Sequence, residues 1–100
     1  MKLNYNELIK QESINLCTKG LCDNDVEVLI KVIGQSTVLE ELYLDNNKLT
    51  LADGMLATAI ANNTTLKELW LWRNNISQQG IKHLANALKE NNTLQELFTW

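Results

Sequence analysis

The chain repeats one pattern of leucine and asparagine, and this repetition constrains the fold more than any other feature of the sequence. Residues 39–49 read LEELYLDNNKL, and residues 66–76, which begin 27 positions later, read LKELWLWRNNI. Residues 94–100 repeat the first part of the pattern after a further 28 positions. Residues 11–21 form a degraded earlier copy that keeps only some of the apolar positions. A unit of this length is one strand-and-helix element that cannot bury its own apolar side, so neighbouring units must stack.

The shared template, L-x-x-L-x-L-x-x-N-x-L, resembles the leucine-rich repeat, and the period is similar to that of its ribonuclease-inhibitor-like class. The resemblance covers about residues 11–100. Proteins of this class include ribonuclease inhibitor, the sensor regions of NOD-like receptors and the Ran GTPase-activating protein. The resemblance implies an α/β fold, a solenoid with a parallel sheet on its concave side and helices on its convex side. It also implies intracellular protein binding, without indicating a particular partner.

The second part of each unit predicts a helix with one apolar stripe, because leucine and isoleucine recur four residues apart. The pairs are Leu29 with Ile33, Leu56 with Ile60, and Leu84 with Leu88. Thr50 and Ser77 are the expected N-caps, since a hydroxyl can accept from the first free N–H groups of a helix. The turns at 62–65 and 91–93 are rich in asparagine, which bonds its own backbone in turns.

These boundaries predict a single domain in four parts. Residues 1–38 form an amino-terminal capping segment with the degenerate repeat, residues 39–65 and 66–93 are full repeats, and residues 94–100 are a truncated repeat. Leu3, Leu8 and Ile9 are the expected contacts of the cap. Because the pattern is cut in its middle, we expect a fragment of a longer array. Two alternatives remain open: a second copy covers the end, or the last strand is frayed.

In the family, the asparagine of the template points inward and bonds the turn backbone of adjacent repeats. The resemblance therefore implies a structural role for Asn47 and Asn74. Lys19 takes this position in the first copy, and its ammonium group cannot accept hydrogen bonds from the turn backbone. The first copy therefore differs from the others, as the terminal repeat of a solenoid usually does.

The outward positions of the predicted strands indicate a binding surface. Successive side chains of a strand point to opposite faces, so the leucines at 42, 44, 69 and 71 face the helices and the residues between them face away. The outward residues gather five of the six aromatic side chains of the chain next to a row of carboxylates. We predict that a protein partner with a basic surface binds there. The predicted binding residues are Tyr43, Trp70, Trp72, Phe98 and Trp100, with Glu41, Asp45, Glu68 and Glu96.

Two other interpretations of the aromatic residues remain open. They could stack on one another and stiffen the sheet, or they could form a self-association face, helped by an exposed carboxy-terminal strand edge. The function also has alternatives: regulation of a small GTPase, by resemblance to the Ran GTPase-activating protein, or a purely structural role in a longer repeat array.

Composition and charge exclude several classes. A net charge of −3 argues against nucleic acid and anionic membrane as partners. The sequence lacks a long apolar run or an apolar signal segment, and two cysteines are too few for a disulfide framework, so a cytoplasmic setting is expected. Cys17 and Cys22 are expected to be free thiols, and His83 a solvated residue of the helix side. We therefore predict a protein that is not an enzyme and that uses neither a metal nor a cofactor.

Overall fold

Strands and helices alternate along the chain. The computed structural model describes residues 2–99. Its elements are α1 (Tyr5–Leu8), β1 (Ser13–Asn15), the 3-10 helix η1 (Asp23–Val26), α2 (Glu27–Gln35), β2 (Glu41–Tyr43), α3 (Met55–Asn62), β3 (Glu68–Leu71), α4 (Gln78–Glu90) and β4 (Glu96–Thr99).

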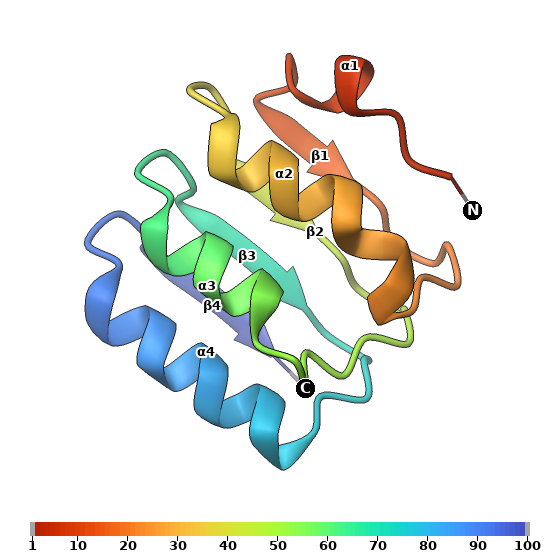
Figure 1. Ribbon diagram of the computed structural model, residues 1–100, viewed down its shortest axis with the longest axis vertical. Coiled ribbons are helices and arrows are strands. Elements are labelled where there is room, and N and C mark those ends of the chain that lie inside the picture. The colour runs from red at the N-terminus through yellow and green to blue at the C-terminus, as the bar shows by residue number, and fades with distance from the viewer. Residues whose placement is uncertain (1, 100) are drawn as a thin grey trace.

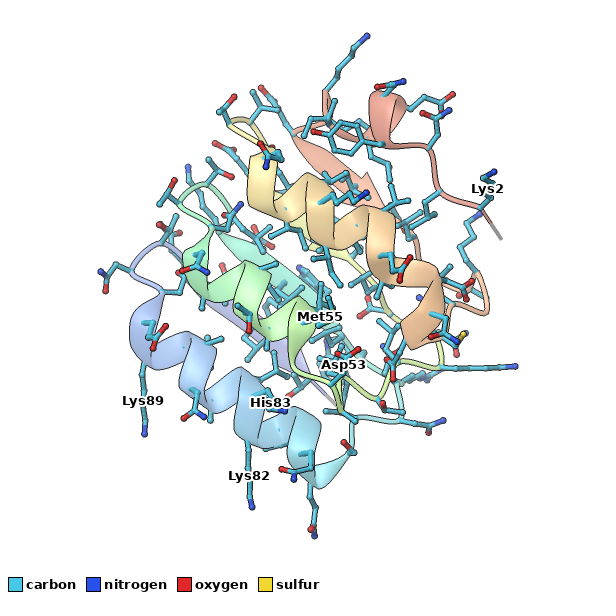
Figure 2. The ribbon with its side chains drawn as sticks, viewed as in Figure 1. Lys2, Asp53, Met55, Lys82, His83 and Lys89 are labelled. Atoms are coloured by element: carbon cyan, nitrogen blue, oxygen red, sulfur yellow. The ribbon has the colours of Figure 1, made fainter. Side chains whose placement is uncertain are left out.

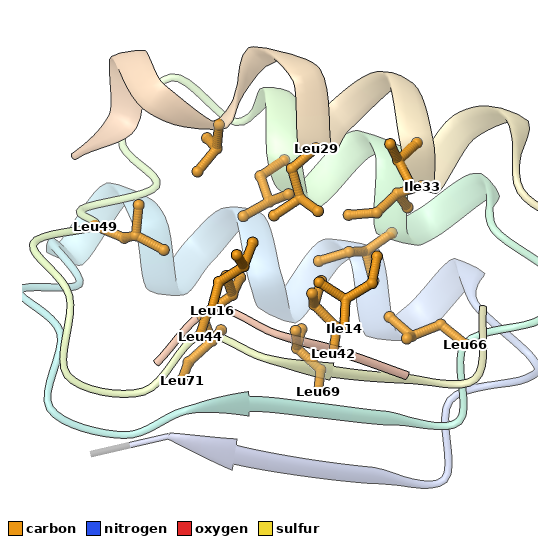
Figure 3. Packing of buried hydrophobic residues seen from close by; sticks show 14 of the residues in the cluster. Ile14, Leu16, Leu29, Ile33, Leu42, Leu44, Leu49, Leu66, Leu69 and Leu71 are labelled. Atoms are coloured by element: carbon orange, nitrogen blue, oxygen red, sulfur yellow. The ribbon is translucent and has the colours of Figure 1, made fainter. Parts of the chain in front are cut away.

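The four strands form one parallel sheet in the order β1-β2-β3-β4, so each strand pairs with its neighbours in the sequence. α2, α3 and α4 lie side by side on one face of this sheet (Figures 1 and 3). No described helix or strand lies over the other face. The predicted α/β class, with a parallel sheet and helices segregated to one side of it, is therefore confirmed.

The core fills the space between the sheet and the helices. Figure 3 shows Ile14, Leu42 and Leu69 rising from three successive strands toward Leu29 and Ile33 of α2. Each of these five side chains is at most 1% exposed. Burying such a side chain contributes about 1.5–3 kcal/mol. A shift of the strand register by one residue would turn these leucines away from the helices and lose that energy, so the leucine spacing determines the register.

The amino-terminal segment closes the β1 end of this core. Asn4 caps α1 by accepting a hydrogen bond from the backbone of Glu7, which fixes the short helix. Leu3 and Leu8 are then buried in the main core, and Ile9 packs against it. All three expected contacts of this segment are confirmed.

Asn47 ties two neighbouring units together. Its Oδ1 accepts from the backbone N–H groups of Lys19 and Leu21 at 3.1 and 3.0 Å. Its Nδ2 donates to the carbonyl oxygens of Leu16 and Leu44 at 3.0 and 2.9 Å. The predicted inward, structural position of this asparagine is confirmed.

Asn74 repeats the arrangement one unit later. It accepts from Leu49 N–H at 3.0 Å and donates to the Leu44 carbonyl at 2.9 Å, so it again joins its own unit to the preceding one. Asn74 is half-buried, so losing these partners should cost less than the loss for a fully buried amide, which is about 1–3 kcal/mol.

A left-handed corner follows each of the first three strands. Thr18, Asn46 and Arg73 have φ angles of 56°, 57° and 57°, although none of them is glycine. The corners are held across units, because the N–H of Thr18 donates to the Asp45 carbonyl at 3.0 Å and that of Asn46 to the Trp72 carbonyl at 2.7 Å.

The prediction for Thr50 was wrong. α3 begins only at Met55, and its N-cap is Gly54, with a φ of 76° and no side-chain capping bond. Thr50 instead donates its N–H and its hydroxyl to the carboxylate of Asp23, in the preceding unit. Ser77 is confirmed as an N-cap, since its Oγ accepts from Gly80 N–H at 3.0 Å.

The last unit also differs from one expectation. Leu88 was predicted to belong to a buried stripe, but it is 40% exposed, and α4 buries Gly80, Leu84 and Ala87 instead. β4 pairs with β3 in register along its described length, from Glu96 to Thr99.

Candidate functional site: the open sheet face

The sheet face opposite the helices presents the predicted columns of side chains in register. Glu41 faces Ser13 and Glu68 across the two neighbouring strands, and Glu68 faces Glu96. In the next column, Asn15, Tyr43, Trp70 and Phe98 lie opposite one another. Because neighbouring strands are about 4.8 Å apart, such side chains touch across the strands.

Tyr43, Trp70 and Phe98 form a continuous row of rings, here called the aromatic ladder. The ring centroids of Trp70 and Phe98 are 3.9 Å apart, with planes inclined by 23°. Those of Tyr43 and Trp70 are 5.5 Å apart and tilted by 34°. All three side chains are half-buried. The rings therefore stack as well as line an open face, so one of the alternative interpretations describes part of their role.

Trp70 is oriented by a hydrogen bond in addition to this stacking. Its indole Nε1 donates to Glu68 Oε1 at 3.1 Å. The carboxylate row and the aromatic ladder are thus directly connected within β3.

Trp72 lies just beyond the end of β3. Its side chain is 44% exposed, more than those of Tyr43, Trp70 and Phe98. Its backbone N–H donates to Asp45 Oδ1 at 2.8 Å, which fixes the main chain while the indole remains open to solvent. Trp100, the remaining predicted binding residue, lies outside the described residues.

Asp45 is held between two units. Besides the bond from Trp72, its Oδ2 lies 3.8 Å from the Sγ of Cys17. Partial burial, together with the negative charge of Asp45, raises the pKa of the Cys17 thiol. Cys17 and Cys22 are both free, as predicted.

The electrostatics of the sheet face are negative. The pKa of Tyr43 is raised, first by desolvation and then by the charges of Glu41 and Glu68, with a smaller effect from Asp45. The one ion pair among residues 2–99 joins Lys67 to Glu40, neither of which belongs to the face. Within residues 2–99, therefore, none of the carboxylates of the face takes part in an ion pair.

The helix side differs in its chemistry. Figure 2 shows Lys82 and Lys89 of α4 pointing away from the molecule. Open grooves of about 220 and 520 Å³ run between α3 and α4 and between α2 and α3. These grooves lie on the opposite side from the predicted binding residues, so the sheet face remains the candidate site.

His83, predicted to be a solvated residue of the helix side, is partly exposed but also contacts the preceding unit. It is half-buried, its Nε2 lies 3.2 Å from the Ala52 carbonyl, and its ring packs against Gly54. A Cβ on Gly54 would approach that ring to 3.0 Å, so α4 and the start of α3 fit together through this pair. Ala52 and His83 are 31 residues apart, and no local pattern predicts their contact.

Residues 2–99 contain no group of three or more histidine, cysteine, aspartate or glutamate side chains that could hold a metal ion. Within the same residues, no helix has the length and apolar character needed to cross a membrane.

Comparison with known proteins gives two similarities of different weight. No family model matches the chain. Over 73 residues, or 72% of its length, the chain is 34% identical to the protein phosphatase 1 regulatory subunit 37 homolog of Caenorhabditis briggsae. The chain spans only 8% of the length of that relative.

The fold is similar to that of the solved leiomodin-1 actin-binding site 2. The TM-score is 0.84, and the match covers 95% of this chain and 59% of the solved one. Sequence identity is 22%, so this likeness concerns the fold alone.

Proposed function

We propose that the chain is a segment of a leucine-rich-repeat solenoid of the ribonuclease-inhibitor-like class, and that it binds a partner protein through its open sheet face. The strand–corner–helix unit supports the first part, because it recurs with the same register, the same left-handed corner and the same bridging asparagine. The units proposed here are those at 39–65 and 66–93. A cytoplasmic setting belongs to the same proposal.

One observation carries the binding role: the sheet face is the only large face of the described sheet that no helix covers, and the aromatic ladder and Trp72 lie on it. Tyrosine and tryptophan are typical anchors of protein interfaces, because they bury a large area and have few rotatable bonds. The indole of Trp72 is 44% exposed beside the ladder. A large exposed apolar side chain next to other aromatic rings is typical of a binding surface and adds little to a sheet with a purely structural role.

The relative's name supports a protein partner, since a regulatory subunit acts by binding another protein. Protein phosphatase 1 is therefore a defined candidate partner, and actin, from the name of the solved structure, is a second probe. Neither name refers to a GTPase. The two other roles predicted from the sequence, GTPase regulation and a purely structural segment, have no observation in their favour beyond the sequence resemblance.

The proposal is tested by binding of the purified chain to the catalytic subunit of protein phosphatase 1 and to actin, measured by calorimetry. We expect Trp72→Ala to weaken binding of the true partner about tenfold or more, as for an interface anchor. Leu88→Ala is the matched control, because this side chain is exposed to a similar extent, at 40%, but lies on α4.

Equal binding by wild type and Trp72→Ala, with loss in Leu88→Ala, would place the interface on the helix side and contradict the proposal. Absence of binding to either probe would remove both candidates, and with them the support that the relative's name gives.

A further inference from the structure

The aromatic ladder has one free ring face at its β2 end. Tyr43 covers one face of the Trp70 indole and Phe98 covers the other, so both faces of Trp70 are occupied. β1 contributes Asn15, not an aromatic residue, at the position opposite Tyr43. The face of the Tyr43 ring that is turned toward β1 therefore has no ring against it.

The outward side chains of β1 are small compared with the rings of the aromatic ladder. Asn15 Oδ1 accepts from the Cys17 N–H at 3.0 Å, which holds the asparagine close to its own strand. Ser13 and Cys17, the outward residues before and after it, are also short. We call this change from a ring on β2 to a small polar side chain on β1 the Asn15–Tyr43 step.

Negative charge surrounds the step on the β2 side. Glu41 lies two residues before Tyr43 on the same face of β2. Asp45 follows two residues after Tyr43, just past the end of β2, where its Oδ1 accepts from Trp72 N–H. The pKa of Tyr43 is raised first by desolvation, then by the charges of Glu41 and Glu68, by a hydrogen bond with Glu41 and by the charge of Asp45, so all three carboxylates act at this side chain. No lysine or arginine occupies an outward position of the described strands. These positions hold Ser13, Asn15, Glu41, Tyr43, Glu68, Trp70, Glu96 and Phe98, and Cys17, Asp45 and Trp72 come just after the ends of β1, β2 and β3.

We propose that the Asn15–Tyr43 step binds an arginine side chain of the partner protein, with its guanidinium group stacked on the free face of Tyr43 and its N–H groups directed to Glu41 and Asp45. This inference rests on the proposed function and specifies the chemistry of the partner. A guanidinium fits because it is planar, stacks on aromatic rings and donates in its own plane toward carboxylates on either side. A lysine ammonium has the charge but lacks the flat surface.

The test uses the isotope-labelled chain at low ionic strength and three short peptides that differ at one central residue: arginine, lysine or citrulline. Citrulline keeps the shape of arginine but carries no charge. We expect the arginine peptide to shift the backbone amide signals of Asn15 and Tyr43, and to bind at least about fivefold more tightly than the citrulline peptide. The lysine peptide should fall between them.

Two variants address the step directly. Asn15→Tyr extends the aromatic ladder by one ring and fills the step, so binding of the arginine peptide should be lost while the amide spectrum of the core stays that of the wild type. Glu41→Gln should weaken binding about threefold or more, with Glu96→Gln, in the same carboxylate row but two strands away, as its control.

Three results would overturn the inference: equal affinity for arginine and citrulline peptides, wild-type binding by Asn15→Tyr, or the same effect of Glu41→Gln and Glu96→Gln. A partner that is lost in Trp72→Ala while arginine peptides do not bind would leave the proposed function intact and refute this inference alone. Arginine peptides that bind at the step, with a partner insensitive to Trp72→Ala, would refute the proposed function instead.

Discussion

Asp23 joins two units by accepting three hydrogen bonds from one loop. The N–H and hydroxyl of Thr50 and the N–H of Leu51 all donate to its carboxylate. Desolvation works against the charged form, but these hydrogen bonds outweigh it and lower the pKa of Asp23 below its ordinary value. Sequence analysis missed this residue because its partners are 27 and 28 positions away, in another unit.

We expect Asp23→Ala to lower the free energy of unfolding by about 1 kcal/mol at pH 7, the usual size of a lost capping interaction. Because the pKa of Asp23 is lower in the folded state than in the unfolded state, its ionised form stabilises the fold at pH values above the unfolded pKa. This stabilisation is lost as the pH falls through the folded pKa. The gap between wild type and variant should be constant from about pH 5 to 7 and close below about pH 4.

Urea denaturation at a series of pH values measures this gap. Glu90→Ala, at the exposed end of α4, is the control and should stay within about 0.5 kcal/mol of wild type. A gap between wild type and Asp23→Ala that widens toward acid pH would contradict the assignment.

At the scale of the elements, two glycines lie in helices but meet different surroundings. A Cβ on Gly80, in α4, would approach the Thr50 carbonyl oxygen to 2.2 Å, whereas one on Gly34, in α2, would meet nothing within 4 Å. Gly80 therefore determines how closely the start of α4 approaches the preceding unit.

We expect Gly80→Ala to destabilise the fold by about 1–3 kcal/mol, as overpacking against a backbone atom does. Gly34→Ala should stabilise it by about 0.5–1 kcal/mol, because alanine is the better helix former and has room. Thermal unfolding monitored by circular dichroism measures both changes. Equal shifts of the two midpoints in the same direction would refute the distinction.

The sequence predicted most of these elements, because the leucine spacing reports directly on the side of the sheet that each residue faces. The buried positions of Leu42 and Leu69, and the columns of residues on the sheet face, follow from that spacing alone. The late start of α3 could not be predicted, since it depends on Gly54 adopting a left-handed φ beneath His83, a residue of the next helix. Likewise, Trp70 was recognisable as outward, but its hydrogen bond to Glu68 was not.

At the scale of the whole molecule, equivalent positions differ in exposure along the stack. Ile33 and Ile60 are 1% and 0% exposed, whereas Leu88, at the corresponding place in α4, is 40% exposed. Ile81 of the same helix is 42% exposed. Ile33 of α2 and Ile60 of α3 are each followed by a further strand and helix of the stack, which cover them.

We expect this end of the stack to self-associate at high protein concentration, through α4 and the edge of β4. The double variant Ile81→Lys with Leu88→Lys should remain monomeric where the wild type does not, as measured by light scattering across a dilution series. Lys82→Ala with Lys89→Ala, on the outer side of α4, is the control. Association that persists in the double lysine variant would assign the contact to another surface.

The left-handed corners at Thr18, Asn46 and Arg73 have a consequence for opening of the fold. A side chain in this backbone conformation costs about 1 kcal/mol, and the main chain regains that energy once it leaves the corner. Each of the first two corners is fastened by the carbonyl of the unit that follows it, so neighbours restrain one another. Opening of either corner must therefore also break a contact with the next unit, and we expect the amide hydrogens of Thr18 and Asn46 to exchange slowly, as hydrogen-exchange measurements would show.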